Sequence, residues 1–196
     1  MTRVLLGLTG SIGMGKSTTA QMFRDMGCDM WDADAAVHRL YEPGGAAVAP
    51  IGAAHPAAVE NGRVNRENLK KWIANDQTAL SKIETIVHPL VQNDRNNFKN
   101  HAKSDILVFD IPLLFETGSQ AEFDHVVVVH TDAQTQKHRV LERGGMTQDH
   151  FNLILSKQMP SDQKCAMADF VVHTTTLDGA RQKVAEIVNG LRAQNA

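Results

Sequence analysis

The sequence predicts an α/β fold in three layers: a parallel sheet of about five strands with helices on both of its faces. Five short apolar runs carry this prediction, at residues 3–9, 28–31, 106–109, 125–130 and 170–173. Such runs suit strands that are buried on both faces, as the strands of a parallel sheet are. Helical patterns separate most of these runs, and strands that alternate with helices are typical of an α/β domain.

Four helices are expected around this sheet, at residues 16–26, 132–143, 147–158 and 178–192. In the last of them, apolar side chains recur at helical spacing and form one face, at Val184, Ile187, Val188 and Leu191. Gly27 follows the first helix and suits its C-cap, because glycine adopts the left-handed conformation without strain.

A helical block interrupts this alternation. Residues 41–64 contain several glycines and prolines and the pair Asn61-Gly62, which are typical of loops and turns. Three helices are then expected: Asn65 and Asp76 would cap the first two, and the third would begin at Pro89. Their inward side chains are expected to be Leu69, Trp72, Ile73, Leu80, Ile83, Val87, Leu90, Val91 and Phe98.

The domain organisation that follows is a single domain of residues 3–196. Its core would consist of about residues 3–40 and 104–196. The helical block of about 60–103 would be an insertion into that core.

Composition excludes several classes of protein. Of the 196 residues, 42% are hydrophobic and 21% are charged, as in ordinary globular proteins. The net charge of −2 argues against a nucleic-acid partner, because duplex-binding proteins usually carry a basic surface. No apolar run approaches the ~18 residues of a membrane span. The N-terminal run is interrupted too early for a secretory signal, so we expect a cytoplasmic protein without a membrane partner.

The two cysteines, Cys28 and Cys165, support the same location. Neither lies in a spacing that binds metal. We expect both to be reduced thiols, and small buried hydrophobic side chains would explain them equally well.

Residues 10–17 read GSIGMGKS and match the pattern GxxxxGK[ST] in full. The glycines let backbone N–H groups turn toward phosphate oxygens, and the helix that follows presents its positive N-terminal end. Lys16 would reach the β- and γ-phosphates, and Ser17 would bind Mg²⁺. The sequence therefore predicts binding of ATP or GTP with Mg²⁺, although a glycine-rich turn with an incidental lysine would give the same letters. The nucleotide contacts are expected from Gly13, Met14, Gly15, Lys16, Ser17 and Thr18.

Three aspartates follow predicted strands, and ligands of parallel sheets bind at the carboxyl ends of the strands. One of Asp32 and Asp34 would deprotonate or orient an acceptor hydroxyl, and the other would help to hold the metal. Asp34 could instead be a helix N-cap. Asp110 has the position of a metal-side carboxylate, although a turn residue at the strand end would look the same.

Arg139 and Arg143 lie four residues apart on a predicted helix. Like charges at this spacing repel each other unless a ligand neutralises them, and a triphosphate would do so. Gly144 and Gly145 follow as a possible hinge. The pattern predicts a closing lid of about residues 137–160 whose arginines act in catalysis, and a solvated basic helix face is the alternative.

With these motifs in place, the chain resembles the dephospho-coenzyme A kinase family over about residues 3–192. The resemblance rests on an ordered series of segments: residues 7–10, 32–34, 42–44, 61–66, 88–89 and 110–116, the helix with Arg139 and Arg143, and Gln158. It implies a P-loop kinase fold with a helical coenzyme A subdomain and a small lid. The implied reaction converts ATP and dephospho-CoA to ADP and CoA. We expect a monomer, and an oligomer is the alternative.

The resemblance also implies roles for single residues. Asp34 would be the base for the ribose 3′-hydroxyl, and Lys16 with the two lid arginines would stabilise the transferring phosphoryl group. The substrate contacts would come from Arg66, His88, Pro112, Leu113, Leu114 and Glu116, and the metal contacts from Ser17, Asp32 and Asp110. His88 as a helix cap and Leu113, Leu114 and Phe115 as ordinary core are the alternatives.

The chain departs from the family pattern at a few positions. Ser11 and Met14 replace a glycine and a serine, and residues 53–55 replace a Phe-Gly pair. Residues 174–176 are three threonines where asparagine and glycine are usual. A nucleoside or nucleotide monophosphate kinase with the same core is the rival function. A GTPase switch would need an NKxD motif, which the sequence lacks, and a catalytically silent ATP-binding module is the remaining alternative.

Overall fold

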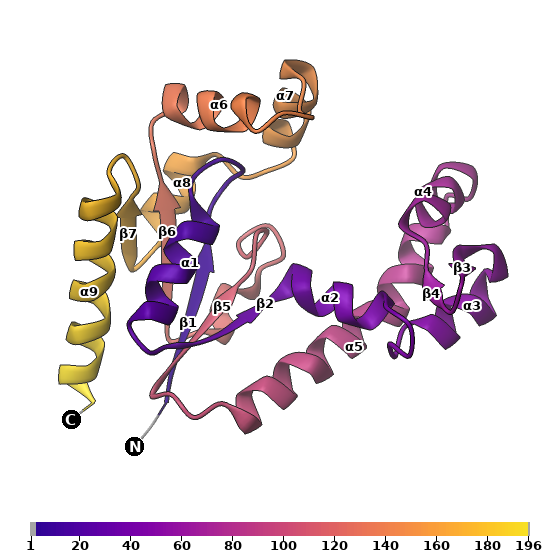
Figure 1. The fold of residues 1–196 in the computed structure, drawn as a ribbon, viewed down its shortest axis with the longest axis horizontal. Coiled ribbons are helices and arrows are strands. Elements are labelled where there is room, and N and C mark those ends of the chain that lie inside the picture. Colours follow the sequence, from indigo (N-terminus) through magenta and orange to yellow (C-terminus); the bar gives the residue numbers. More distant parts are fainter. Residues whose placement is uncertain (1–2, 196) are drawn as a thin grey trace. The chain divides into compact units, whose positions relative to one another are not determined.

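The computed structural model describes residues 3–195. The chain divides into two compact units (Figure 1). Unit 1 runs to Trp31 and resumes at Ala102, and unit 2 is Asp32–His101. Each unit is described separately.

Unit 1 is built on a five-stranded sheet with the order β2-β5-β1-β6-β7. The strands are β1 (Val4–Thr9), β2 (Asp29–Asp32), β5 (Ile106–Asp110), β6 (His125–His130) and β7 (Phe170–His173). The pairs β1–β5, β1–β6 and β6–β7 are parallel. The predicted α/β fold with a parallel sheet is confirmed.

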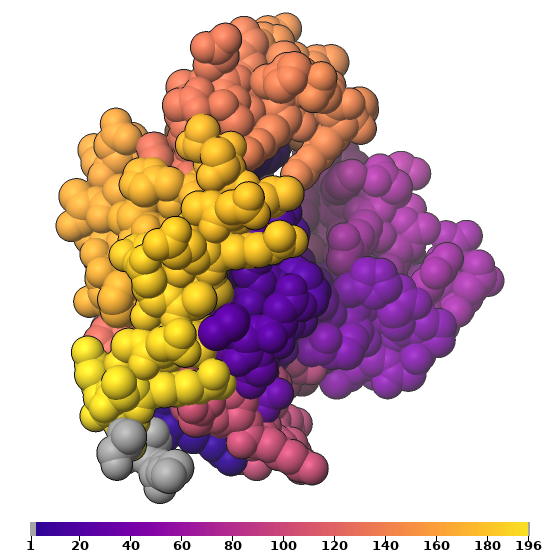
Figure 2. Space-filling view, turned by 60° about the vertical axis from the view of Figure 1, so that its left-hand side comes forward, coloured from indigo at the N-terminus to yellow at the C-terminus, as the bar shows by residue number. Residues whose placement is uncertain are grey.

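Strand β6 shows why this sheet needs a layer on each face. Val127 and Val129 belong to a cluster with α1 (Lys16–Asp25) and α9 (Leu177–Gln194), which lie side by side (Figure 2). Val126 and Val128 pack on the other face, against Leu114 and other side chains of a separate cluster. Successive side chains of a strand point to opposite faces, so four consecutive valines fill two cores.

The remaining helices of unit 1 follow β6. They are α6 (Ala133–Glu142), α7 (Gln148–Ser156) and α8 (Ser161–Met167), and a 3₁₀ turn η2 (Ser119–Glu122) precedes β6. Helices α1, α6, α7 and α9 confirm the four that were predicted, each within two residues at either end. Helix α8 was not predicted, because its seven residues are too few to show an apolar period.

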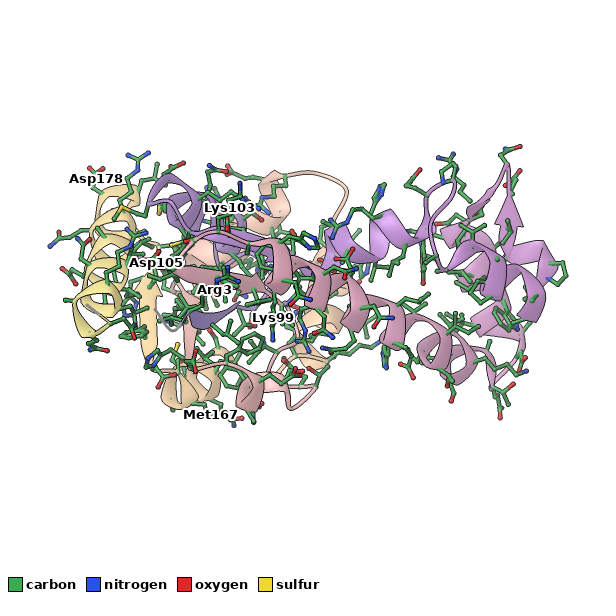
Figure 3. All side chains as sticks on the ribbon, turned by 90° about the horizontal axis from the view of Figure 1, so that it is seen from below. Arg3, Lys99, Lys103, Asp105, Met167 and Asp178 are labelled. Carbon is green, nitrogen blue, oxygen red and sulfur yellow. The ribbon has the colours of Figure 1, made fainter. Side chains whose placement is uncertain are left out.

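An ion pair joins the C-terminal helix α9 to the segment directly before β5. Arg192 near the end of α9 donates two hydrogen bonds to Asp105, which Figure 3 labels. These bonds hold the pKa of Asp105 below its ordinary value of 3.8.

Unit 2 is mostly helical. It contains α2 (Ala33–Tyr41), α3 (Val48–Ala54), η1 (Pro56–Ala58), the hairpin of β3 (Val59–Glu60) and β4 (Arg63–Val64), α4 (Arg66–Asn75) and α5 (Ala79–His101). The expectation of loops throughout residues 41–64 was wrong. Ile51, Ala58 and Val64 anchor α3 and the hairpin in the core of this unit. Asn61 and Gly62 have positive φ angles of 51° and 74°, which suit a two-residue hairpin turn.

The two helices expected after residue 76 are one helix, α5, with Pro89 in its interior. A proline there removes one helical hydrogen bond, which is why the sequence suggested a helix start. Ile83 and Val87 before it and Val91 after it pack in one core, and this burial keeps the helix continuous. Asn65 caps α4 as predicted.

Two of the side chains expected to face inward do not. Leu80 is 50% exposed and Ile73 is 38% exposed, so both lie outside the core of unit 2.

Candidate active site

The candidate phosphate-binding loop joins β1 to α1 in unit 1. Gly13 and Gly15 have φ angles of 79° and 91°, in the left-handed region that favours glycine. A Cβ atom on Gly13 would lie 2.5 Å from Cγ2 of Val140 and 2.9 Å from the carbonyl oxygen of Gln136. The close packing leaves no room for a side chain at Gly13, although the pattern GxxxxGK[ST] leaves this position open.

The N-terminus of α1 is open to an anion. Gly15 is the N-cap residue and provides no side-chain hydrogen bond, and the first turn contains no acidic residue. Ser17 and Thr18 in this turn are exposed. Unsatisfied N–H groups and the helix dipole favour negative charge at such an end. The arrangement can therefore bind phosphate.

Lys16 and Asp110 come together beside this helix end. The Lys16 ammonium group forms an ion pair and hydrogen bond with Oδ1 of Asp110. Asp110 ends β5, in register with Leu8 of β1, and is only 4% exposed. The structure thus brings the predicted phosphate-binding lysine to the predicted metal-side carboxylate, at the carboxyl ends of adjacent strands.

Three hydrogen bonds hold the backbone of the loop, and a fourth holds the side chain of Met14. Nε2 of Gln136 donates to the carbonyl oxygen of Ile12 at 2.7 Å, and Oε1 of Gln158 accepts from the N–H of Ile12 at 3.2 Å. The hydroxyl of Thr174 donates to the carbonyl oxygen of Met14 at 2.7 Å. Sδ of Met14 accepts from the N–H of Thr131 at 3.2 Å. Met14 is 3% exposed, so its side chain anchors the loop and only its backbone is available to a ligand.

Sequence reasoning missed Gln136 and Thr131 altogether. Both contact the loop from segments more than 100 positions away, and no local pattern marks such partners.

The two predicted lid arginines have different surroundings. Arg139 on α6 donates to the hydroxyl and to the carbonyl oxygen of Thr174, at 3.0 and 2.7 Å. Arg143 is the C-cap residue of α6 and is exposed. Gly144 and Gly145 follow with φ angles of 71° and 75°.

Glu116 lies in a buried ion pair. Its Oε1 accepts from the N–H of Met159 at 2.8 Å and lies 2.8 Å from Nζ of Lys164, which is fully buried. Burial acts to raise the pKa of Glu116, but the ion pair with Lys164 and the hydrogen bond from the N–H of Met159 outweigh it and hold that pKa below 4.5. Lys164 was missed because the short helix α8 was missed; Pro160 directly before Ser161 was the available signal of a helix start.

The neighbouring apolar residues have different exposures. Leu114 is fully buried in the cluster of Phe115, Val126 and Val128, as the core interpretation expected. Leu113 is 43% exposed. The carbonyl oxygen of Pro112 accepts a hydrogen bond from the hydroxyl of Thr9 at 3.1 Å.

Unit 2 carries the second group of predicted residues. Asp32 caps α2 by accepting from the N–H of Ala35 at 2.9 Å, so the cap considered for Asp34 falls on Asp32 instead. Asp34 is exposed in the first turn of α2. It lines an open cavity of about 740 Å³ together with Ala35, Val37, His38, Arg39 and Arg66. The cavity combines one carboxylate with two guanidinium groups, a combination that suits a phosphorylated alcohol.

His88 is exposed on α5, with Pro89 beside it. Its interpretation as a helix cap was wrong, because α5 continues through both residues.

The donor set near Lys16 suits Mg²⁺. Within residues 3–195, no three His, Cys, Asp or Glu side chains form a metal-binding group. Mg²⁺ commonly takes one or two protein oxygens and completes its shell with substrate phosphates and water. The Ser17 hydroxyl and the Asp110 carboxylate are oxygen ligands of this kind.

Two further observations concern membrane-spanning helices and the cysteines. None of the helices in the described part is long and apolar enough to cross a bilayer. Cys28 and Cys165 form no disulfide, and burial raises the pKa of Cys28 to about 11.

Comparison with known proteins decides the family. A sequence model of the family described as dephospho-CoA kinase matches residues 4–178, which is most of the chain. The dephospho-CoA kinase of Ruegeria pomeroyi is 60% identical over 190 residues, 97% of this chain and 96% of that protein. The chain belongs to the dephospho-CoA kinase family.

A second dephospho-CoA kinase agrees with this assignment, and a solved structure shares the fold. The dephospho-CoA kinase of Cereibacter sphaeroides is 52% identical over 187 residues, 95% of each protein. A crystal structure of a protein from Thermus thermophilus has a TM-score of 0.86 and 26% identity, over 97% of this chain and 98% of that one. The resemblance to dephospho-CoA kinases that the motifs indicated is therefore confirmed.

Proposed function

We propose that this chain transfers the γ-phosphoryl group of ATP to the 3′-hydroxyl of dephospho-CoA, which gives CoA and ADP. The observation that carries the proposal is the ion pair of Lys16 and Asp110 beside an open helix N-terminus, in a member of the dephospho-CoA kinase family. Phosphoryl transfer needs little covalent help from a protein. It needs positioning and positive charge where charge develops.

The loop and the start of α1 would hold the triphosphate. The backbone N–H groups of Gly13, Met14 and Gly15 and of the first turn of α1 would donate to phosphate oxygens. Lys16 would leave Asp110 for the β- and γ-phosphates, because a triphosphate offers more negative charge than one carboxylate. Arg139 and Arg143 would add positive charge to the transferring group, Arg143 from an exposed position next to two hinge glycines.

Ser17 and Asp110 would hold Mg²⁺, with Asp32 as a further carboxylate on its water ligands. Bound there, Mg²⁺ would supply positive charge that neutralises part of the negative charge of the triphosphate. Asp110 would be released for this role when Lys16 moves to the phosphates.

Asp34 would accept the proton of the ribose 3′-hydroxyl. It is the exposed carboxylate of a cavity that also presents Arg66, a partner for the substrate's phosphate groups. His88 on the exposed face of α5, with Pro112 and Leu113 in unit 1, would form further substrate contacts, and Leu113 offers the exposed apolar surface for an apolar arm. Leu114, which is fully buried, and Glu116, which pairs with Lys164, would support the substrate-binding segment from within the fold.

We further propose that the chain works as a monomer in the cytoplasm. The unpaired cysteines support the location, since a reducing compartment keeps thiols free.

The test is an ADP-release assay with Mg·ATP, carried out with and without dephospho-CoA. Dephospho-CoA should stimulate ADP release well above the rate with water alone. A panel of nucleosides and nucleoside monophosphates serves as the control. Stimulation by a nucleoside monophosphate but not by dephospho-CoA would replace the proposal with a nucleotide kinase.

A further inference from the structure

Thr174 occupies the junction between the phosphate loop and helix α6. It follows β7 and is 7% exposed. Its hydroxyl donates to the carbonyl oxygen of Met14 at 2.7 Å and accepts from Nη1 of Arg139 at 3.0 Å. Its own carbonyl oxygen accepts from Nη2 of Arg139 at 2.7 Å, and its N–H donates to His130 at the end of β6 at 2.9 Å. Thr174 is therefore held on both sides by the sheet and by α6.

The hydrogen bonds run from Arg139 through the Thr174 hydroxyl to the carbonyl oxygen of Met14, and the groups at the two ends set their direction. The guanidinium group of Arg139 can only donate, and the carbonyl oxygen of Met14 can only accept. The lone pair of the Thr174 hydroxyl faces Arg139, and its single proton points to the carbonyl oxygen of Met14 at 2.7 Å, which is much closer than the other acceptor, the carbonyl oxygen of His130 at 3.4 Å. A charged donor at one end polarises the hydroxyl and strengthens the bond at the other end.

The Met14 carbonyl shares a planar trans peptide with the N–H of Gly15, so the two groups point in opposite directions. A donor that fixes the carbonyl oxygen therefore also fixes the direction of the Gly15 N–H. Thr174 also contacts Gly15 directly: a Cβ atom on Gly15 would lie 3.2 Å from the Thr174 hydroxyl oxygen. Gly15 has a φ of 91°, and glycine at this angle rotates easily unless something holds the peptide.

We infer that Thr174 is a positioning residue for ATP. Its hydroxyl, oriented by Arg139, holds the Met14–Gly15 peptide so that the Gly15 N–H points away from Thr174 and toward a bound phosphate. Arg139 then acts on the nucleotide through Thr174, in addition to its charge. The inference rests on the proposed role of the loop as the ATP site.

The test compares two variants of the full chain. Thr174→Val removes the hydroxyl and keeps the shape, and Thr174→Ser keeps the hydroxyl and removes the methyl group. For Thr174→Val we expect the Kd of ADP and the KM of ATP to rise about tenfold. This is the size of effect expected when one hydrogen bond to a charged group, here from the Gly15 N–H to a phosphate, is lost. The KM of dephospho-CoA should stay within about twofold, because the altered peptide belongs to the nucleotide side; a purely structural defect would raise both. Thr174→Ser should restore the ATP and ADP values to within about twofold of wild type.

The outcomes distinguish failure of this inference from failure of the proposed function. Unchanged ADP binding in Thr174→Val, or equal loss in Thr174→Ser and Thr174→Val, would overturn the inference and leave the proposed function intact. A wild-type chain that binds no ADP would overturn the proposed function itself. Thermal unfolding monitors the fold, and if Thr174→Val does not fold, Thr174→Ala takes its place against the same serine variant.

Discussion

Lys16 and Asp110 form an ion pair that joins the first turn of α1 to the end of β5. The pair places an ammonium group and a carboxylate where a triphosphate and its metal would have to lie. Each of the two side chains is therefore already held near the position that its proposed role requires, and binding of Mg·ATP has to separate them.

Lys16→Met removes the positive charge and keeps most of the side-chain length. We expect kcat to fall by about 10²–10³-fold, the usual loss when one preorganised charge stabiliser is removed. Steady-state kinetics with saturating dephospho-CoA measure it. Lys183→Met is the matched control, because Lys183 is half-buried on α9, pairs with Glu186 and lies outside the phosphate loop. Equal rates in the wild type and in Lys16→Met would contradict the proposed role of Lys16.

Asp34→Asn removes the proposed base and changes little else. We expect kcat to fall by about 10²-fold or more. The affinity for ADP should stay unchanged, since Asp34 is not part of the phosphate loop. Asp178→Asn is the control, an exposed carboxylate on α9 that Figure 3 labels. Retained turnover in Asp34→Asn would show that another group accepts the proton.

Glu116→Gln removes the charge that faces the buried Lys164. At pH 7 the variant should lose about 2 kcal/mol of unfolding free energy, because a buried ammonium group loses its charged partner. Urea unfolding of both proteins measures the difference.

The same pair predicts a pH dependence. The pKa of Glu116 is below 4.5 in the folded chain, so the ionised form is favoured by folding. This contribution is complete above the unfolded pKa near 4.5 and is lost as the pH falls through the lower folded value. The difference in unfolding free energy between the wild type and Glu116→Gln should therefore become smaller below pH 4.5. A difference in unfolding free energy that stays constant as the pH is lowered would contradict a stabilising ion pair of Glu116 and Lys164.

Gly13→Ala places a methyl group against Val140 and Gln136 in a backbone conformation that disfavours it. We expect a loss of about 1–3 kcal/mol of stability together with weaker ADP binding. Gly190→Ala is the matched control: it lies in α9, and nothing lies within 4 Å of the added Cβ atom. That change should instead add about 0.5–1 kcal/mol, because alanine favours a helix. Differential scanning calorimetry and ADP titration test both variants.

The sequence carried the central part of the fold and of the site. Consecutive valines at 126–129 indicated a strand buried on both faces, and the packing of β6 on two clusters confirms it. The phosphate-loop motif indicated a strand followed by a helix, and β1 and α1 confirm that too. Both signals are local, and local signals are what a single sequence displays.

What the sequence missed depends on contacts between distant residues. The continuity of α5 through Pro89 comes from burial on both sides of the proline, which overrides its local preference. Lys164 was not singled out, because its partner Glu116 lies 48 positions away and shares no sequence pattern with it. Thr174 was noted only as a departure from the family pattern, and only the folded chain shows that its hydroxyl reaches the carbonyl oxygen of Met14.

The position of the new phosphate on the product tests the central claim most directly. ³¹P NMR of the reaction mixture, with mass spectrometry of the isolated product, should show one new monoester on the 3′-oxygen of the ribose of dephospho-CoA, formed in step with ADP. Release of inorganic phosphate without this monoester, or a monoester on another hydroxyl, would contradict the proposal that this chain directs ATP to that one oxygen.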